Sequence, residues 1–258
     1  MTAVAQSYYM TRRHARQLIR QPWFLMVTLV QPIIWLLLFG SLFRSVTEIP
    51  GFAASGTYLD YLVPGIIVMT ALMASGWSGM GVIEDIERGL LDRFLAGPTH
   101  RSSLIVGRIG YEALALAIQG AIMGSLAWVL GATFASGIGG FVVLLGIAVL
   151  VAFAFASLSC AMALALRNRE SVIGVNTMLT LPLTFLSAAF MPLALAPDWI
   201  ETVATANPIN WAIVAGREAL VADPDWTLIL PRVAGLVIVA LLSLALATRT
   251  FRSYQRSA

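Results

Sequence analysis

Long runs without any charged residue constrain what this chain can fold into. Residues 23–43, 61–83 and 113–166 contain no Asp, Glu, Lys or Arg. A helix needs about 20 apolar residues to cross a bilayer, where its backbone polar groups must bond within the segment. Only 11% of the chain is charged, against roughly 25% in an ordinary soluble domain. The chain is therefore predicted to be an all-α membrane protein.

The uncharged runs divide into six predicted transmembrane helices. The run 113–166 is too long for one span, and the Gly-rich stretch from Gly131 to Gly140 splits it. The predicted spans are residues 23–43, 61–83, 108–130, 141–166, 171–196 and 229–248. Two short outer-side helices are expected between spans five and six, because Pro197 suits a helix start and Asn207-Pro208 breaks the chain. The alternative there is an ordinary loop anchored by interfacial Trp.

The basic residues predict the orientation. All 16 are Arg, and 13 of them lie before span one, between spans two and three, between spans four and five, or after span six. Because positive residues favour the cytoplasmic side, both termini and the tail 249–258 are predicted to be cytoplasmic, in a bacterial inner membrane. The Arg residues flank spans instead of forming one patch, so no nucleic-acid partner is predicted.

The segment 1–22 precedes the first span and is rich in Arg. Its apolar residues offer an imperfect helical face, which favours an interfacial helix lying on membrane lipids. The basic residues of that helix are Arg12, Arg13, Arg16 and Arg20. The alternative is a solvated, positively charged flank.

Several kinds of chemistry are missing from the residue inventory. The chain has no Lys, so it has no Walker A motif and no Lys-based catalysis. The two His residues and the single Cys160 do not suggest a metal site. We therefore predict that the chain binds no cofactor or metal and is not itself an enzyme.

The stretch EDIERGLLDRFLAGPTHR, residues 84–101, interrupts the apolar chain with seven charged side chains. Burying so many charges in a bilayer is too costly, which places the stretch in the cytoplasm. Ile83, Ile86, Leu90 and Phe94 follow helical spacing and form an apolar stripe. Glu84–Arg88 and Arg88–Asp92 are i,i+4 pairs of opposite charge. Four acids against three Arg fit a protein partner better than an anionic lipid surface.

Two segments resemble the ABC-2 type transporter permeases. In the charged stretch and its continuation, Glu87, Gly89, Leu91, Pro98, Gly107 and Arg108 match the family's cytoplasmic signature. After span five, Pro192, Pro197, Trp199, Asn207, Pro208 and Arg217 are similar to its "FP…LP-x-W…NP…R" segment. Leu90 and Asp92 depart from the family's usual Thr and Glu. The overall style is most similar to the daunorubicin-resistance type of permease.

The resemblance implies a transport complex. Two permease subunits, identical or different, would pair and bind two copies of a separate ABC ATPase, which would hold the ATP and Mg. The helix after span two would be the coupling helix that docks on the ATPase. Its residues would be Glu84, Asp85, Glu87, Arg88, Gly89, Leu91, Asp92, Phe94 and Pro98. The exported substrate would be an amphiphilic drug, lipid or lipid-linked glycan.

The resemblance also suggests a pathway and an outer gate. Candidates for the pathway or dimer face are Gln31, Trp35, Phe39, Asn176, Thr180 and Phe185. Candidates for the gate are Phe190, Pro192, Trp199, Asn207 and Trp211. Polar residues in spans also commonly hydrogen-bond between helices, and aromatic residues also serve in packing or face lipid. Two other functions stay open, namely a membrane scaffold without transport activity and an intramembrane transferase.

Overall fold

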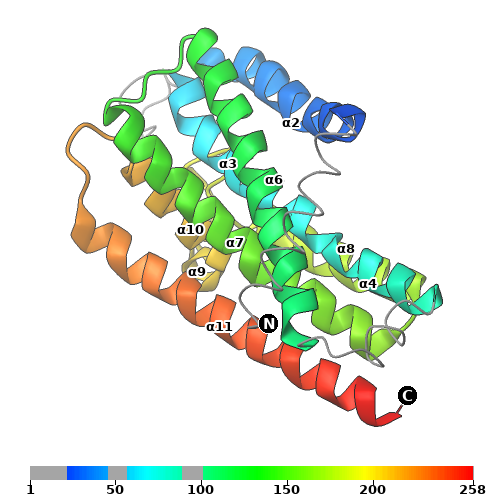
Figure 1. The fold of residues 1–258 in the computed structure, drawn as a ribbon. Coiled ribbons are helices and arrows are strands. Elements are labelled where there is room, and N and C mark those ends of the chain that lie inside the picture. The colour runs from blue at the N-terminus through cyan, green and yellow to red at the C-terminus, as the bar shows by residue number, and fades with distance from the viewer. Residues whose placement is uncertain (1–21, 46–56, 89–100, 258) are drawn as a thin grey trace.

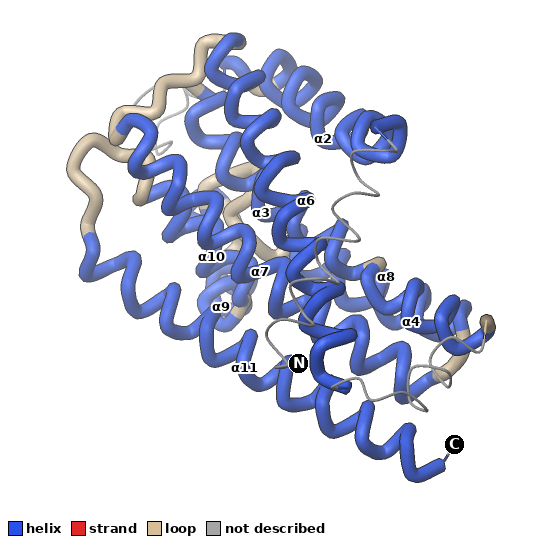
Figure 2. The backbone as a smooth tube through the Cα atoms, in the orientation of Figure 1, coloured by secondary structure: helices blue, strands red, loops and turns tan. Residues whose placement is uncertain are grey.

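The structure is a computed structural model that describes residues 22–45, 57–88 and 101–257 (Figure 1). Within these ranges the chain forms helices and no strand (Figure 2). The helices are α2 (Pro22–Leu42), α3 (Tyr58–Gly76), α4 (Ser78–Glu87), α6 (Arg101–Val129), α7 (Gly137–Leu166), α8 (Arg169–Phe185), the 3-10 helix η2 (Leu193–Leu195), α9 (Asp198–Ala206), α10 (Pro208–Glu218) and α11 (Trp226–Ser257). The all-α prediction is confirmed for the part of the chain that is described.

Helix α7 occupies the middle of the bundle and packs against α3, α4, α6, α10 and α11 (Figure 1). Its buried face is rich in small residues, including Ala148, Ala152, Ala156 and Ala163. Small side chains let helix backbones approach closely, which is how membrane helices gain packing energy without a hydrophobic driving force between them. Helix α7, which is long, apolar and rich in Ala, is thus suited to pack against many neighbouring helices.

Four described stretches are long and apolar enough to cross a membrane. They are Tyr58–Glu87, Glu112–Val129, Gly137–Leu166 and Trp226–Tyr254. The predicted division of run 113–166 is confirmed, since α6 ends at Val129 and α7 begins at Gly137. Gly131 and Gly137 in this connection have φ of +100° and +66°, which suit glycine. Predicted spans 23–43 and 171–196 correspond to shorter apolar or helical stretches, so the count of six stays a prediction.

The fifth predicted span, 171–196, is shorter in the structure than the sequence suggests. Helix α8 begins after Asn168, whose side chain accepts from Ser171 N at 2.9 Å, and it ends at Phe185. Pro182 lacks an N–H, which weakens the last turn. Carbonyls near the end of α8 bond to side chains of other elements, so the apolar chain beyond Phe185 continues without helix.

The second predicted span, 61–83, contains a break between α3 and α4. Trp77 separates the two helices. The break is packed tightly: a Cβ on Gly76 would lie 2.4 Å from Asn176 Oδ1, and one on Gly79 would lie 2.3 Å from Ser159 O. The two glycines allow α7 and α8 to approach the chain where it changes helix.

Helix α11 continues past the predicted sixth span, 229–248, as far as Ser257. Phe251 and Tyr254 are buried together with Val82, Ile83 and Cys160. Most of the predicted tail 249–258 is therefore part of the last helix, and its aromatic residues pack on α4 and α7.

Candidate functional site

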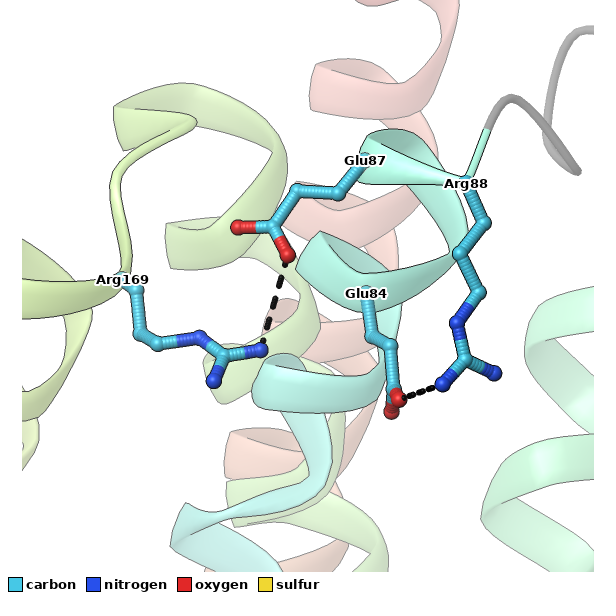
Figure 3. Close-up of polar contacts among 4 residues, drawn as sticks. All are labelled: Glu84, Glu87, Arg88 and Arg169. Atoms are coloured by element: carbon cyan, nitrogen blue, oxygen red, sulfur yellow. Dashed lines mark hydrogen bonds and ion pairs between the residues drawn. The ribbon is translucent and has the colours of Figure 1, made fainter.

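One end of the bundle gathers charged side chains, and we call it the charged end. It comprises Glu84, Glu87 and Arg88 at the end of α4, with Arg167 and Arg169 at the junction of α7 and α8. Arg88 Nη2 pairs with Glu84 Oε1, as the i,i+4 spacing predicted (Figure 3). Arg169 Nη2 lies 3.6 Å from Glu87 Oε2. These four paired side chains are 44–64% exposed, so each pair contributes at most about 1 kcal/mol and remains accessible to a partner.

The apolar side of α4 is buried inside the same chain. Ile83 is in a cluster with Val172, Phe251 and Tyr254, and Ile86 packs against that cluster. Arg167 lies over the Tyr254 ring, with its guanidinium carbon 4.7 Å from the ring centroid. The predicted stripe therefore starts by docking on α7, α8 and α11, and only the charged side of α4 faces outward. Leu90 and Phe94, which continue the stripe, lie outside the described residues.

Other predicted coupling residues fall outside the described part of the chain. These are Gly89, Leu91, Asp92 and Pro98, and the same holds for Arg12, Arg13, Arg16 and Arg20 of the predicted interfacial helix. Asp85 is described and half-buried on α4. Farther along the bundle, Glu112 Oε1 accepts from Ser78 Oγ at 3.4 Å, which links α6 to the start of α4.

Away from the charged end, residues 186–197 connect α8 to α9 without α-helical structure, and we call them the break segment. Asn207 holds its start. Asn207 Nδ2 donates to Leu183 O at 2.8 Å and to Leu186 O at 2.7 Å. Asn207 Oδ1 accepts from Ile209 N at 2.9 Å, which caps α10. One buried side chain thus forms hydrogen bonds to backbone groups at the end of α8 and at the beginning of α10.

The backbone N–H and the backbone carbonyl of Ala188 are both bonded by side chains of α3 and α10. Its carbonyl accepts from Tyr61 Oη at 3.0 Å and from Arg217 Nη2 at 2.9 Å. Its N–H donates to Asn210 Oδ1 at 3.0 Å. The Arg217 guanidinium carbon lies 3.5 Å from the centroid of the Tyr61 ring, and Nη2 also donates to Tyr61 O at 3.2 Å. We call Tyr61, Asn210 and Arg217 the Ala188 clamp.

Sequence reasoning did not assign the clamp a role. Arg217 stands out in the sequence only as part of the family-like segment after span five, and neither Tyr61 nor Asn210 is among the residues that match a motif. The available signal was chemical: a chain that leaves helical structure among apolar helices needs side-chain donors and acceptors for its backbone. Polar residues in the flanking apolar runs, such as Tyr61 and Asn210, were the natural suppliers.

An aromatic cluster lies beside the break segment and joins α2 to it. Phe190 is the centre, with ring centroids 5.6 Å from Trp35, 5.0 Å from Phe39 and 6.4 Å from Phe185. Tyr58 Oη donates to Phe190 O at 2.9 Å. The structure therefore brings pathway candidates Trp35 and Phe39 of α2 together with Phe185 and gate candidate Phe190, which lie far from α2 in the sequence.

The remaining pathway candidates lie elsewhere. Asn176 and Thr180 are on the buried face of α8, where Thr180 Oγ1 donates to Asn176 Oδ1 at 3.5 Å. This face meets the break between α3 and α4 at Gly76. Gln31 is exposed on α2. Asn176 and Thr180 thus pack inside the chain, whereas the outward face of α8 exposes apolar side chains, including Met178, Leu181 and Phe185.

The other gate candidates surround the break segment without forming one group. Pro192 precedes η2. Trp199 is exposed on α9. Trp211 Nε1 donates to Thr205 O at 2.6 Å, and its ring lies against Gly235 of α11. Two short helices, α9 and α10, are present where the sequence predicted them.

A pocket of about 370 Å³ opens between α2 and α3 next to Tyr58. Its walls combine apolar side chains with hydroxyl groups and one cation. They are formed by Leu36, Leu37, Gly40, Ser41, Arg44, Thr57, Tyr58, Leu59, Leu130 and Gly131. Such a lining suits a small molecule with both apolar and polar parts.

Comparison with known proteins identifies the family of this chain. The model of the ABC-2 type transporter family matches residues 5–221, which include both the charged end of α4 and the break segment. The chain is 31% identical over 224 residues to a protein of Cyanophora paradoxa named as a putative transport permease, ycf38, covering 81% of this chain and 72% of that protein. It is 28% identical over 217 residues to the daunorubicin resistance ABC transporter permease protein DrrB1 of Streptomyces coeruleorubidus, covering 81% and 74%.

A protein of Mycobacterium tuberculosis named as a probable doxorubicin resistance ABC transporter permease protein, DrrC, is 26% identical over 259 residues, covering 95% of this chain and 89% of that protein. The family match spans most of the chain and ends just before α11. The helical bundle, Glu87 at its charged end and the Asn207-Pro208 turn beside the break segment agree with that match. This chain belongs to the ABC-2 type transporter family.

Proposed function

We propose that this chain is the membrane permease subunit of an ATP-driven exporter that moves an amphiphilic drug, lipid or lipid-linked glycan outward. A separate ABC ATPase would bind and hydrolyse ATP with Mg, because this chain has no Lys for a Walker A motif. Family membership and the permease names of its relatives support this assignment. The structural observation that best supports this assignment is the charged end. There, Glu84, Glu87 and Arg88 face outward from a helix that is anchored in the bundle.

We infer that the charged end is cytoplasmic and that α2 and α8 complete six spans. Arg88, Arg167 and Arg169 are at this end, as are Arg249 and Arg252 near the end of α11. That concentration supports a cytoplasmic position by the positive-inside rule. The motion of two ATPase subunits would then enter through the exposed charges of α4.

The second permease subunit, identical or different, would cover apolar faces of α2 and α8. Val30, Ile34 and Leu38 are exposed on α2, and Met178 and Leu181 on α8. These faces need a second subunit or lipid against them. With the aromatic cluster adjoining α2, a substrate path between subunits would be lined by aromatic rings and by the pocket next to Tyr58.

The test is reconstitution of the chain with its ATPase in vesicles, followed by ATP-dependent substrate movement. Glu87→Arg and Arg88→Glu are expected to reduce transport by about tenfold or more, because each reverses a charge at the docking surface. Glu201→Arg is the matched control, since Glu201 is an exposed acid on α9 away from the charged end. Assembly with the ATPase but no ATP-dependent movement of any amphiphile would support a scaffold instead. Unchanged transport in both charge reversals would exclude the coupling role of α4.

A further inference from the structure

We infer that Tyr61, Asn210 and Arg217, the Ala188 clamp, are the positioning residues that keep the break segment closed against α3. The inference rests on the proposed export function for its meaning as a gate. The closed arrangement of the break segment against α3 rests on the contacts of the clamp alone.

The break segment needs internal hydrogen-bond partners for its backbone. Residues 186–192 leave helical structure among long apolar helices, and backbone groups in such surroundings must find internal partners. The clamp provides them at Ala188 for both the N–H and the carbonyl. Ala188 is buried, so water is not a ready substitute. Opening the segment at Ala188 would leave its N–H and its carbonyl without partners at the same time. The closed arrangement is therefore a defined state.

Helix α3 and the break segment approach each other closely through their backbones. A Cβ on Gly65 would lie 2.5 Å from Ala189 O. Tyr61 and Tyr58 precede Gly65 on α3 and bond to Ala188 O and Phe190 O. Three consecutive residues of the break segment thus contact one helix, and movement of that helix must change these contacts.

Arg217 is bound by neutral groups. Its bonding partners are the carbonyl oxygens of Tyr61 and Ala188, together with the Tyr61 ring. Among the described residues it forms no ion pair. A planar guanidinium can bond two carbonyls while stacking on a ring, whereas a Lys ammonium cannot reproduce that geometry. Neutral acceptors also hold a cation less tightly than a carboxylate does, so the clamp can open and close.

Helices α3 and α4 connect the clamp to the charged end. The stretch Tyr58–Glu87 is 30 residues long, or about 45 Å at the rise of an α-helix. It carries Tyr61 near one end and Glu84 and Glu87 at the other. Displacement of α4 by an ATPase would therefore reach the clamp along one pair of consecutive helices.

The experiment measures access to the break segment without any ATPase. In a Cys160→Ser background, Ser187→Cys places a thiol next to Ala188 by an isosteric change at a buried position. Its rate of reaction with a membrane-impermeant maleimide is measured on the purified chain in vesicles. Tyr61→Phe, Arg217→Gln and Arg217→Lys are each expected to raise the rate about fivefold or more, because each removes part of the clamp.

The matched control is Tyr254→Phe, which removes the same hydroxyl at the charged end and is expected to leave the rate unchanged. The double variant Tyr61→Phe/Arg217→Gln is expected to be less than additive, because both residues bond Ala188 O. If an Arg217 variant fails to fold, the labelling rate of Tyr61→Phe still tests the clamp, since that change removes only one oxygen atom.

Equal labelling rates in Tyr61→Phe and the parent would overturn the clamp even if ATP-driven export is intact. The clamp variants could label faster even though the chain, together with its ATPase, exports nothing. That result would support the clamp and contradict the proposed function.

Discussion

The hydroxyl of Ser159 in α7 donates to the carbonyl oxygen of Gly76 at 2.5 Å, where α3 gives way to α4. The same hydroxyl accepts from Gly79 N at 2.9 Å, on the other side of the break. One side chain of the central helix therefore replaces backbone bonds that the interruption at Trp77 removes. This joins the two halves of a stretch that is otherwise continuous and apolar.

Replacing Ser159 with Ala is expected to destabilise the protein by about 1–3 kcal/mol, because two buried backbone groups lose their partner. Ser157→Ala is the matched control. Ser157 is equally buried, but its hydroxyl donates to Phe153 O within α7 at 2.7 Å, so its loss leaves no backbone group of another helix unpaired. Unfolding of the purified chain in mixed micelles measures both. A similar loss in the two variants would contradict the bridging role of Ser159.

The glycines at the break offer a second prediction, which concerns packing. Gly79→Ala is expected to be more damaging than Gly76→Ala. The added methyl at residue 79 meets the backbone oxygen of Ser159, whereas at residue 76 it meets the side chain of Asn176, which can move.

Gly146→Ala is the control for helix propensity, because nothing lies within 4 Å of a Cβ there. It is expected to be neutral, or stabilising by up to about 1 kcal/mol. Thermal unfolding ranks the three variants. Equal stability of the Gly79 and Gly146 variants would show that α4 and α7 are not in close contact at residue 79.

The sequence was sufficient for features that depend on local composition. Uncharged length predicts the long helices, and the Gly-rich stretch after Val129 predicts where α6 and α7 separate. The i,i+4 spacing of Glu84 and Arg88 predicts their ion pair, which forms on one face of a helix.

Features that depend on contacts between distant residues could not be read in this way. Residues 186–196 are as apolar as a span, yet α8 ends at Phe185 because side chains from α3 and α10 bond the backbone beyond it. Likewise, nothing in the run 61–83 distinguishes Gly76 from any other small residue until Asn176 packs against it. The Ala188 clamp joins residues more than 100 positions apart, and only the fold brings them together.

The start of α11 is expected to be sensitive to acid. Asp225 Oδ1 accepts from Thr227 N at 2.9 Å and from Thr227 Oγ1 at 2.6 Å. These hydrogen bonds lower the pKa of the exposed Asp225 carboxyl below its usual 3.8. A lowered pKa means that the carboxylate stabilises the folded state above the unfolded pKa, and that this contribution is lost as the pH falls through the folded value.

Hydrogen exchange at the first amides of α11, compared between neutral pH and pH values below about 4, measures this change after correction for intrinsic rates. Protection is expected to fall with acid in the parent chain. Asp225→Asn keeps an acceptor but cannot titrate, so its protection should not vary over that range. An identical acid response in the two proteins would assign the effect to another group.

The last prediction separates the two roles of Asn207. Asn207→Ser keeps an N-cap acceptor for α10, since Ser is a good capping residue, but it lacks the amide that donates to Leu183 O and Leu186 O. The variant is expected to lose about 2–3 kcal/mol of stability, because carbonyls at the buried end of α8 lose their donors. Asn168→Ser is the matched control, since Asn168 also caps a helix but is exposed, and its side chain accepts from Ser171 N. It is expected to change stability by less than about 0.5 kcal/mol. Equal losses in the two variants would mean that Asn207 acts only as a cap and that the break segment is held by the Ala188 clamp alone.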